Sequence, residues 1–283
     1  MIASVKAGPY TIRGVSVGGV YTSLHVPELD VLFDAGIALR STAAVGTLLL
    51  SHGHADHIGA LPALLGIRAL HQKKTPLRVI MPAEIVESVL AALRAMSELQ
   101  RWPLDIEAIG LRPGDEHPLR KDLLVRAVRT FHPVPSLGYV LVRRVPKLRP
   151  EFARLTGPEI AARRRAGDDL FESADRAELA YATDTLIQAV DHAPELLASK
   201  VLMLEATFLD DRKSLDAARA GCHVHLDEVI ERAPRFTMPH LVLMHFSQVY
   251  RPDEIDGILT ARLPADLRAR THAFVAEGSS WPG

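Results

Sequence analysis

Runs of apolar residues, separated by polar turns, predict alternating strands and helices over most of this chain. Between residues 10 and 40, short apolar stretches alternate with glycines, a pattern typical of antiparallel strands joined by tight turns. Further apolar runs predict strands at 47–50, 77–81, 123–128, 139–142, 179–182, 201–204 and 241–244. Both sides of a charged segment at about 143–178 have this alternation. The sequence therefore predicts one α/β domain over residues 1–283, with the charged segment as an insertion.

Helices are predicted where start signals precede longer apolar patterns. Residues Ile58–Leu65 have the character of the first turns of a buried helix. Pro82 suits a first helical turn and predicts a helix that runs to about Met96. Two more helical segments are expected at 211–220 and 225–232. These helices fall between predicted strands, as a layered α/β architecture requires.

The densest group of chemically active residues is the sequence Ser-His-Gly-His-Ala-Asp-His at positions 51–57. It places His52, His54, Asp56 and His57 between a predicted strand and a predicted helix, which is a stiff setting for metal ligands. A loop so crowded with polar groups beside an apolar strand is costly unless something coordinates them. Imidazole and carboxylate ligands suit zinc or another divalent ion such as Mn²⁺. The motif therefore predicts a metal site, with enough ligands for two adjacent ions.

Three further candidate ligands, His132, Asp184 and His245, also follow apolar strands. Because polar residues at strand ends converge at one rim of a layered fold, these side chains are expected to join the first motif. Two zinc ions need about four ligands each, counting a shared carboxylate and a shared hydroxide. The count closes if Asp184 is the shared carboxylate.

Composition excludes several other classes of protein. The formal net charge is −1, so this is not a globally basic nucleic-acid binder, and a polyanion must be held by a local patch or by metals. One cysteine, Cys222, excludes a disulfide framework and a cysteine zinc site. The first residues lack the apolar core of a signal peptide, and no apolar run is long enough to span a membrane. A cytoplasmic protein is expected.

Five stretches of the sequence resemble the metallo-β-lactamase superfamily and, within it, the ribonuclease Z family. They are residues 50–59, 130–132 with 138–139, 181–185, 205–210 and 245–247. The Glu-Ala-Thr-Phe sequence at 205–208 and the His-Phe-Ser sequence at 245–247 are particular to ribonuclease Z. The beginning of the chain, at 14–19, resembles the short form found in plants. The resemblance implies a four-layered αβ/βα sandwich and a zinc-dependent endoribonuclease that hydrolyses a phosphodiester at the 3′ end of precursor tRNA.

The resemblance also implies a role for each candidate residue. Two zinc ions share Asp184, one held by His52, His54 and His132, and the other by Asp56, His57 and His245. Asp56 is also expected to accept a proton from the attacking water. Glu205 and His223 match a pair proposed to pass a proton to the leaving group. Relatives in this family are typically homodimers in which one subunit's arm serves the other's site, so a homodimer is expected here.

This chain departs from the family pattern at three places. Leu204 stands where the family usually has histidine, and His223-Val224-His225 replaces a usual His-Ser-Thr, so His225 is an alternative to His223 as the acid. No glycine-rich flexible arm is visible, and Leu148–Asp169 occupies its approximate position. Arg163, Arg164 and Arg165 in this stretch can contact phosphate, although such a charge run is more typical of a solvated helical face.

Two other classes of function compete with the nuclease. A small-molecule metallohydrolase of the same fold, acting on a cyclic nucleotide, a lactone or a thioester, is favoured by the near-neutral charge and the missing arm. The stretches at 205–208 and 245–247 favour the nuclease. A non-catalytic scaffold is disfavoured because the ligand set is complete.

Overall fold

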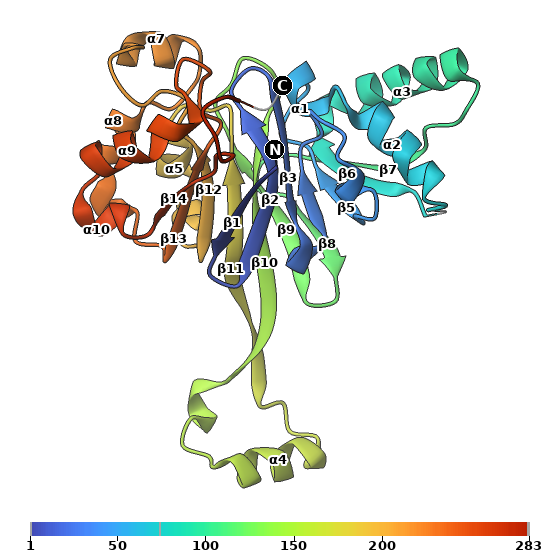
Figure 1. Ribbon diagram of the computed structural model, residues 1–283. Coiled ribbons are helices and arrows are strands. Elements are labelled where there is room, and N and C mark those ends of the chain that lie inside the picture. Colours follow the sequence, from blue (N-terminus) through green and yellow to red (C-terminus); the bar gives the residue numbers. More distant parts are fainter. Residues whose placement is uncertain (1, 74, 282–283) are drawn as a thin grey trace.

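The protein is described by a computed structural model that covers residues 2–73 and 75–281 (Figure 1). Within these residues, two seven-stranded sheets face each other, with strand orders β1-β2-β3-β4-β5-β6-β7 and β14-β13-β12-β11-β10-β9-β8. The first sheet contains β1 (Ala3–Ala7), β2 (Tyr10–Val17), β3 (Tyr21–Val26), β4 (Val31–Phe33), β5 (Thr47–Leu49), β6 (Leu77–Pro82) and β7 (Ile106–Leu111). The second contains β8 (Glu116–Arg120), β9 (Leu123–Arg129), β10 (Leu137–Leu148), β11 (Phe171–Ala182), β12 (Val201–Glu205), β13 (His240–Met244) and β14 (Thr271–Ala273).

Both sheets change from antiparallel to parallel pairing partway across. Pairing is antiparallel from β1 to β4 and from β8 to β11, and parallel from β4 to β7 and from β11 to β14. The parallel halves therefore bring the carboxyl ends of β5, β11 and β13 toward one rim of the sandwich. Predicted ligands come soon after each of these strands.

Helices cover the outer faces of the two sheets (Figure 1). The helices of the described residues are α1 (Ala55–Ile58), α2 (Leu61–Leu70), α3 (Val86–Gln100), α4 (Gly157–Ala166), α5 (Gln188–His192), α6 (Pro194–Leu197), α7 (Leu215–Ala220), α8 (Leu226–Glu231), α9 (Pro252–Arg262) and α10 (Ala265–Arg268), of which α4 lies apart from the sheets. Short 3₁₀ helices lie at Pro27–Leu29, Arg40–Thr42, Ala83–Ile85, Pro150–Phe152 and Ala233–Arg235. One apolar cluster fills the space between the sheets. A second lies between the second sheet and its helices, and a third lies between the first sheet and its helices. The predicted four-layered αβ/βα sandwich is thus confirmed.

Three helix boundaries differ from the sequence prediction. Pro82 ends β6 in an extended conformation, and α3 begins only at Val86, after a 3₁₀ turn. The buried helix expected from Ile58 is two helices, because α1 already begins at Ala55 inside the ligand loop and α2 starts at Leu61. The segment 211–220 is helical only from Leu215, where the Ser214 hydroxyl accepts from the Ala217 amide and caps α7.

Strands β10 and β11 extend beyond the sandwich as a two-stranded ribbon that carries α4 at its tip (Figure 1). The charged segment 143–178 is therefore an arm, which the sequence did not reveal. The ribbon outside the body has no buried face, so it lacks the apolar alternation by which strands are recognised. At its tip, Thr156 and Glu159 form a capping box that starts α4, and Gly167 at φ 94° ends it.

Among the described residues, no helix combines the length and the apolar character needed to cross a membrane.

Candidate metal centre

All seven predicted ligands meet at the rim where the strands end. Their ligand atoms form overlapping groups in which every atom lies within 4.8 Å of the others. Among these groups are His52, His54 and His132; Asp56, His57 and His245; and two that contain Asp184, with His52 and His57 or with His223 and His245. Asp184 therefore lies between the two sets of ligands, with Oδ2 2.9 Å from Nε2 of His57 and 3.4 Å from Nε2 of His245.

Hydrogen bonds fix the tautomers of three buried histidines. Asp34 accepts a hydrogen bond from Nδ1 of His57 at 2.7 Å. The Ser51 hydroxyl donates to Asp34 at 2.8 Å, so it has no second proton and must accept from Nδ1 of His52 at 3.0 Å. By the same argument, the Thr207 hydroxyl donates to Glu205 and accepts from Nδ1 of His245, which lies 3.1 Å away. Each of these rings therefore carries a proton on Nδ1 and turns Nε2 toward the centre, where its neutral form can bind a metal.

The free ring nitrogens match a metal centre. Nε2 of His52, His57 and His245 and Nδ1 of His132 are buried, and none has a hydrogen-bond partner within the described part of the chain. Four such unpartnered nitrogens in one place are costly unless a ligand satisfies them. The lone pairs converge with the carboxylates of Asp56 and Asp184, and this donor set fits zinc or a similar divalent ion.

Strained backbone directs several of these side chains. Asp34, Asp184 and His245 all have positive φ angles, at 57°, 44° and 62°. A non-glycine residue in this region costs about 1–3 kcal/mol and persists only where surrounding contacts require it. All three positions directly follow strands or lie within two residues of a strand end. The strain therefore lies at the places where the chain turns to present a side chain to the centre.

Asp34 is the important residue that the sequence interpretation missed. Its carboxylate is fully buried and accepts from the Ser51 amide at 2.7 Å, the Ser51 hydroxyl, the Tyr181 hydroxyl at 2.6 Å and His57. A partner of this kind orients a ligand histidine and raises its basicity. The available signal was a carboxylate directly after the apolar run 31–33, in a region that the sequence predicts only as strands and tight turns.

Glu205 and His223 lie together beside Asp184. Nδ1 of His223 is 3.1 Å from Oε2 of Glu205 and 3.7 Å from Oδ1 of Asp184. Burial alone would lower the pKa of His223, but the charges of Glu205, Asp184 and Asp56 raise it to about 9. Glu205 is itself fully buried, so it cannot touch a leaving group directly. It also accepts from the Thr185 amide at 2.6 Å, next to Asp184.

His225 has a different part in the structure. Its side chain caps α8 by accepting from the Asp227 amide at 3.2 Å, and its other ring nitrogen is 3.1 Å from the Asp210 carbonyl oxygen. It is buried and occupied by these contacts. Of the two histidines that the sequence left as candidates for the acid, only His223 faces the centre.

Asp56 sits at the open side of the centre. Its side chain is 18% exposed, and Oδ2 lies 3.5 Å from Nε2 of His57. Burial raises the pKa of this carboxyl, but the adjacent His57 ring outweighs that effect and lowers it to about 2. Asp56 is therefore ionised at neutral pH and accessible from solvent.

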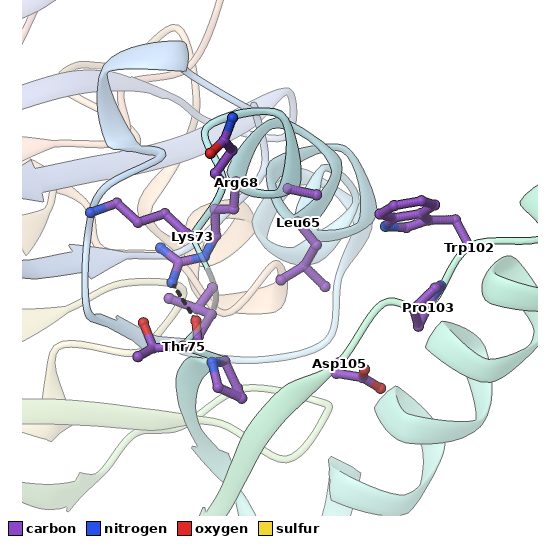
Figure 2. A pocket seen from close by; sticks show the side chains of 11 residues that line it. Leu65, Arg68, Lys73, Thr75, Trp102, Pro103 and Asp105 are labelled. Atoms are coloured by element: carbon purple, nitrogen blue, oxygen red, sulfur yellow. Dashed lines mark hydrogen bonds between the residues drawn. The ribbon is translucent and has the colours of Figure 1, made fainter.

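A separate pocket of about 370 Å³ lies at the other end of the first sheet (Figure 2). Leu77, the first residue of β6, lines it together with Trp102, whereas the metal loop follows the opposite end of the paired strand β5. The Arg68 guanidinium in its wall donates to the carbonyl oxygens of Ala43 at 3.0 Å and Thr75 at 3.3 Å. It contains none of the predicted ligands, and Arg68 supports the chain there.

Known proteins resemble this chain in sequence over most of its length. The profile of a family described as Beta-lactamase superfamily domain matches residues 29–246. tRNase Z TRZ1 of Arabidopsis thaliana is 36% identical over 267 residues, which cover 94% of this chain and 95% of that protein. The chloroplastic tRNase Z TRZ2 of the same plant is 34% identical over 253 residues, covering 89% of this chain and 71% of that protein.

Solved structures share the fold at lower identity. The metallo-β-lactamase fold protein YhfI from Bacillus subtilis matches with a TM-score of 0.61 and 15% identity, over 94% of this chain and 95% of that one. Human tRNase Z, short form, matches with a TM-score of 0.55 and 19% identity, over 88% of this chain and 91% of that one. These likenesses agree with the two mixed sheets flanked by helices described above.

Proposed function

Because the chain belongs to the β-lactamase superfamily and, within it, to the tRNase Z family, we propose that this metal-dependent hydrolase cleaves precursor tRNA at its 3′ end. The observation that carries the proposal is the similarity to the plant tRNase Z, which extends over nearly the whole of both chains. The predicted resemblance to the plant short form is confirmed by the same relative.

The proposed cofactor is a pair of zinc ions in each chain, or Mn²⁺ or another divalent ion in the same positions. His52, His54 and His132 would hold one ion, Asp56, His57 and His245 would hold the other, and Asp184 would be shared. Support comes from the unpartnered ring nitrogens and from the fixed tautomers of the buried histidines. Divalent ions held there supply positive charge to the phosphodiester and lower the pKa of water.

Three side chains of this protein would manage the protons of the reaction. Asp56, ionised and solvent-accessible, would take a proton from the attacking water, whose oxygen forms the new bond to phosphorus. The bond from phosphorus to the ribose 3′ oxygen then breaks, and protonated His223 would give its proton to that oxygen. Glu205 would hold the imidazolium ring in place from behind. The products are a 3′ hydroxyl and a 5′ phosphate.

The arm offers a contact surface for the rest of the tRNA. We propose that residues 1–283 form one metallo-β-lactamase-fold domain from which the arm projects, and that Arg163, Arg164 and Arg165 on α4 contact phosphates. All three side chains are exposed. Strand β11 has 12 residues and runs from the arm toward Asp184, so its first residue, Phe171, is about 35–40 Å from the chain's own metal centre, and α4 lies beyond it.

This distance is consistent with the expected homodimer, in which the arm of one subunit reaches a tRNA bound at the other subunit. Four apolar side chains with large exposed fractions support an interface on the side of α2 and α3. They are Leu70 at 83%, Met96 at 38%, Leu99 at 78% and Trp102 at 58%. Light scattering after gel filtration measures the mass and tests the dimer.

The proposal is tested by giving the zinc-loaded chain two phosphodiesters, a precursor tRNA and bis-p-nitrophenyl phosphate, alongside a lactone and a thioester. We expect hydrolysis of both phosphodiesters. Turnover of only the lactone or the thioester would instead establish the small-molecule metallohydrolase as the function.

A further inference from the structure

Two buried tyrosines of the second sheet reach across to the first sheet beneath the metal centre. The Tyr181 hydroxyl, on β11, donates to Oδ2 of Asp34 at 2.6 Å. The Tyr139 hydroxyl, on β10, donates to the carbonyl oxygen of Leu50 at 2.6 Å. Both side chains have no exposed surface. They are chemically matched, but only one of them reaches a charged side chain.

The Tyr181 contact leads directly to the ligands. Oδ2 of Asp34 accepts from the Tyr181 hydroxyl and, at 2.7 Å, from Nδ1 of His57. The same oxygen accepts from the Ser51 hydroxyl, which in turn accepts from Nδ1 of His52. One buried carboxylate thus orients a histidine from each of the two ligand sets. Among the described residues, Tyr181 is the donor to this carboxylate that comes from the second sheet.

The hydrogen bond from Tyr181 to Asp34 joins the two sheets, and the metal ligands also come from both sheets. The ligands at 52–57 follow β5 of the first sheet, whereas His132, Asp184 and His245 follow strands of the second. Tyr181 lies near the end of β11, three residues before Asp184, and its aromatic ring packs on Phe33, with centroids 4.6 Å apart. The tyrosine therefore contacts Asp34 through its hydroxyl and the strand before Asp34 through its ring.

We propose that Tyr181 is a positioning residue for the metal centre, acting through Asp34 on His57 and His52. Without the hydroxyl, the buried carboxylate keeps its charge but loses the donor that fixes its Oδ2 from the second sheet. The ring nitrogens of both histidines then have a less defined direction relative to Asp184. Partners of metal-ligating histidines typically contribute 10–100-fold to metal affinity, and Tyr181 acts one bond further out, so we expect the lower end, about tenfold.

The test compares Tyr181→Phe with Tyr139→Phe as a matched control. Each variant removes one buried hydroxyl that spans the two sheets, so the metal-free proteins should lose comparable thermal stability. Zn²⁺ alone is titrated against a competing chelator, and the free Zn²⁺ concentration at half occupancy is measured. We expect an increase of about tenfold for Tyr181→Phe and none for Tyr139→Phe. Asp34→Asn, which keeps the shape and removes the charge, should shift it further.

Two results would overturn the proposal: an unchanged half-occupancy concentration in Tyr181→Phe, or an equal increase in Tyr139→Phe. If Tyr181→Phe does not fold, Asp34→Asn decides, because wild-type affinity in that variant removes the route through the carboxylate. The inference rests on the proposed metal centre but not on the RNA substrate. A wild-type chain that binds no Zn²⁺ contradicts the proposed function itself, whereas a wild-type chain that binds it with Tyr181→Phe unchanged contradicts only this inference.

Discussion

Replacing His223 separates general acid catalysis from metal binding. The ribose 3′ oxygen is a poor leaving group and needs a proton, whereas p-nitrophenolate leaves without one. Positioned proton donors typically contribute 10²–10⁴-fold to a rate. His223→Ala should therefore lower kcat/KM for precursor tRNA by that factor, about 3–5 kcal/mol in the barrier, and change hydrolysis of bis-p-nitrophenyl phosphate little.

The structure provides a matched control for this experiment two residues along the chain. His225→Ala removes the side chain that caps α8 and faces the Asp210 carbonyl group rather than the centre. It should cost about 1 kcal/mol of unfolding free energy through the lost cap and leave the ratio of the two activities unchanged. Initial rates on both substrates, with zinc content measured in parallel, provide the comparison.

The pH profile gives a second measurement of the same role. Glu205 and Asp184 raise the pKa of His223 to about 9 against the effect of burial, and bound cations lower it from there. An acid works while protonated, so tRNA cleavage should fall as the pH rises through this pKa, and that limb should be absent in His223→Ala. His223 is not the general acid if His223→Ala slows both substrates equally or loses zinc, or if His225→Ala slows tRNA cleavage alone.

Four further outcomes are expected. Elemental analysis should find two ions in each zinc-loaded chain; one ion that remains single in excess zinc would contradict a centre shared by Asp184. Asp56→Ala should abolish turnover of both phosphodiesters with the fold retained by circular dichroism, and near wild-type rates would exclude it as the base. Replacing Arg163–Arg165 by alanine should raise KM for tRNA alone and flatten its salt dependence, whereas no change would leave these residues as a solvated face. Glu178→Gln should lose about 1.5–3 kcal/mol of unfolding free energy at pH 7, measured in urea, because burial raises the pKa of this carboxyl but the hydrogen bonds from Lys200 and Tyr10 outweigh it and hold the pKa below normal. The loss should disappear as the pH falls through that lowered pKa. A loss that does not depend on pH would show that the charge of Glu178 is not its cause.

The ligands could be predicted because their signal is local. His52, His54, Asp56 and His57 fall within six positions, and the later ligands each follow an apolar strand. Their supports could not be predicted in this way. Asp34 meets Tyr181 across 147 positions of sequence, and nothing in the neighbourhood of either residue indicates the pairing.

The structure also changes what is expected of Glu205. The sequence resemblance gives Glu205 and His223 only the role of an acid pair, outside the set of metal ligands. Glu205 in fact binds the amide of Thr185 beside Asp184 and accepts from Thr207, which holds His245. Its loss should therefore also weaken metal binding, while the loss of His223 should not. Side-chain contacts of this kind depend on the fold and are invisible in a motif.

The arm and the helix starts show the opposite limitation. Strands are recognised in a sequence by the apolar residues of a buried face, and the ribbon of β10 and β11 outside the body has no buried face. Pro82 carries a true helix-start signal, yet the parallel pairing of β6 with β7 extends to Pro82 and Leu111, so the chain stays extended there and α3 begins later. In both cases the long-range pairing of strands overrides the local pattern.

Metal-dependent 3′ processing is tested most directly by cleavage of a 5′-labelled precursor tRNA after the chain has been stripped of metal and then reloaded. We expect no cleavage in chelator, and a single cut at the 3′ end of the tRNA, leaving a 3′ hydroxyl, once Zn²⁺ is returned. Cleavage that persists without metal would contradict metal-dependent processing. So would a metal-loaded chain that leaves the precursor intact.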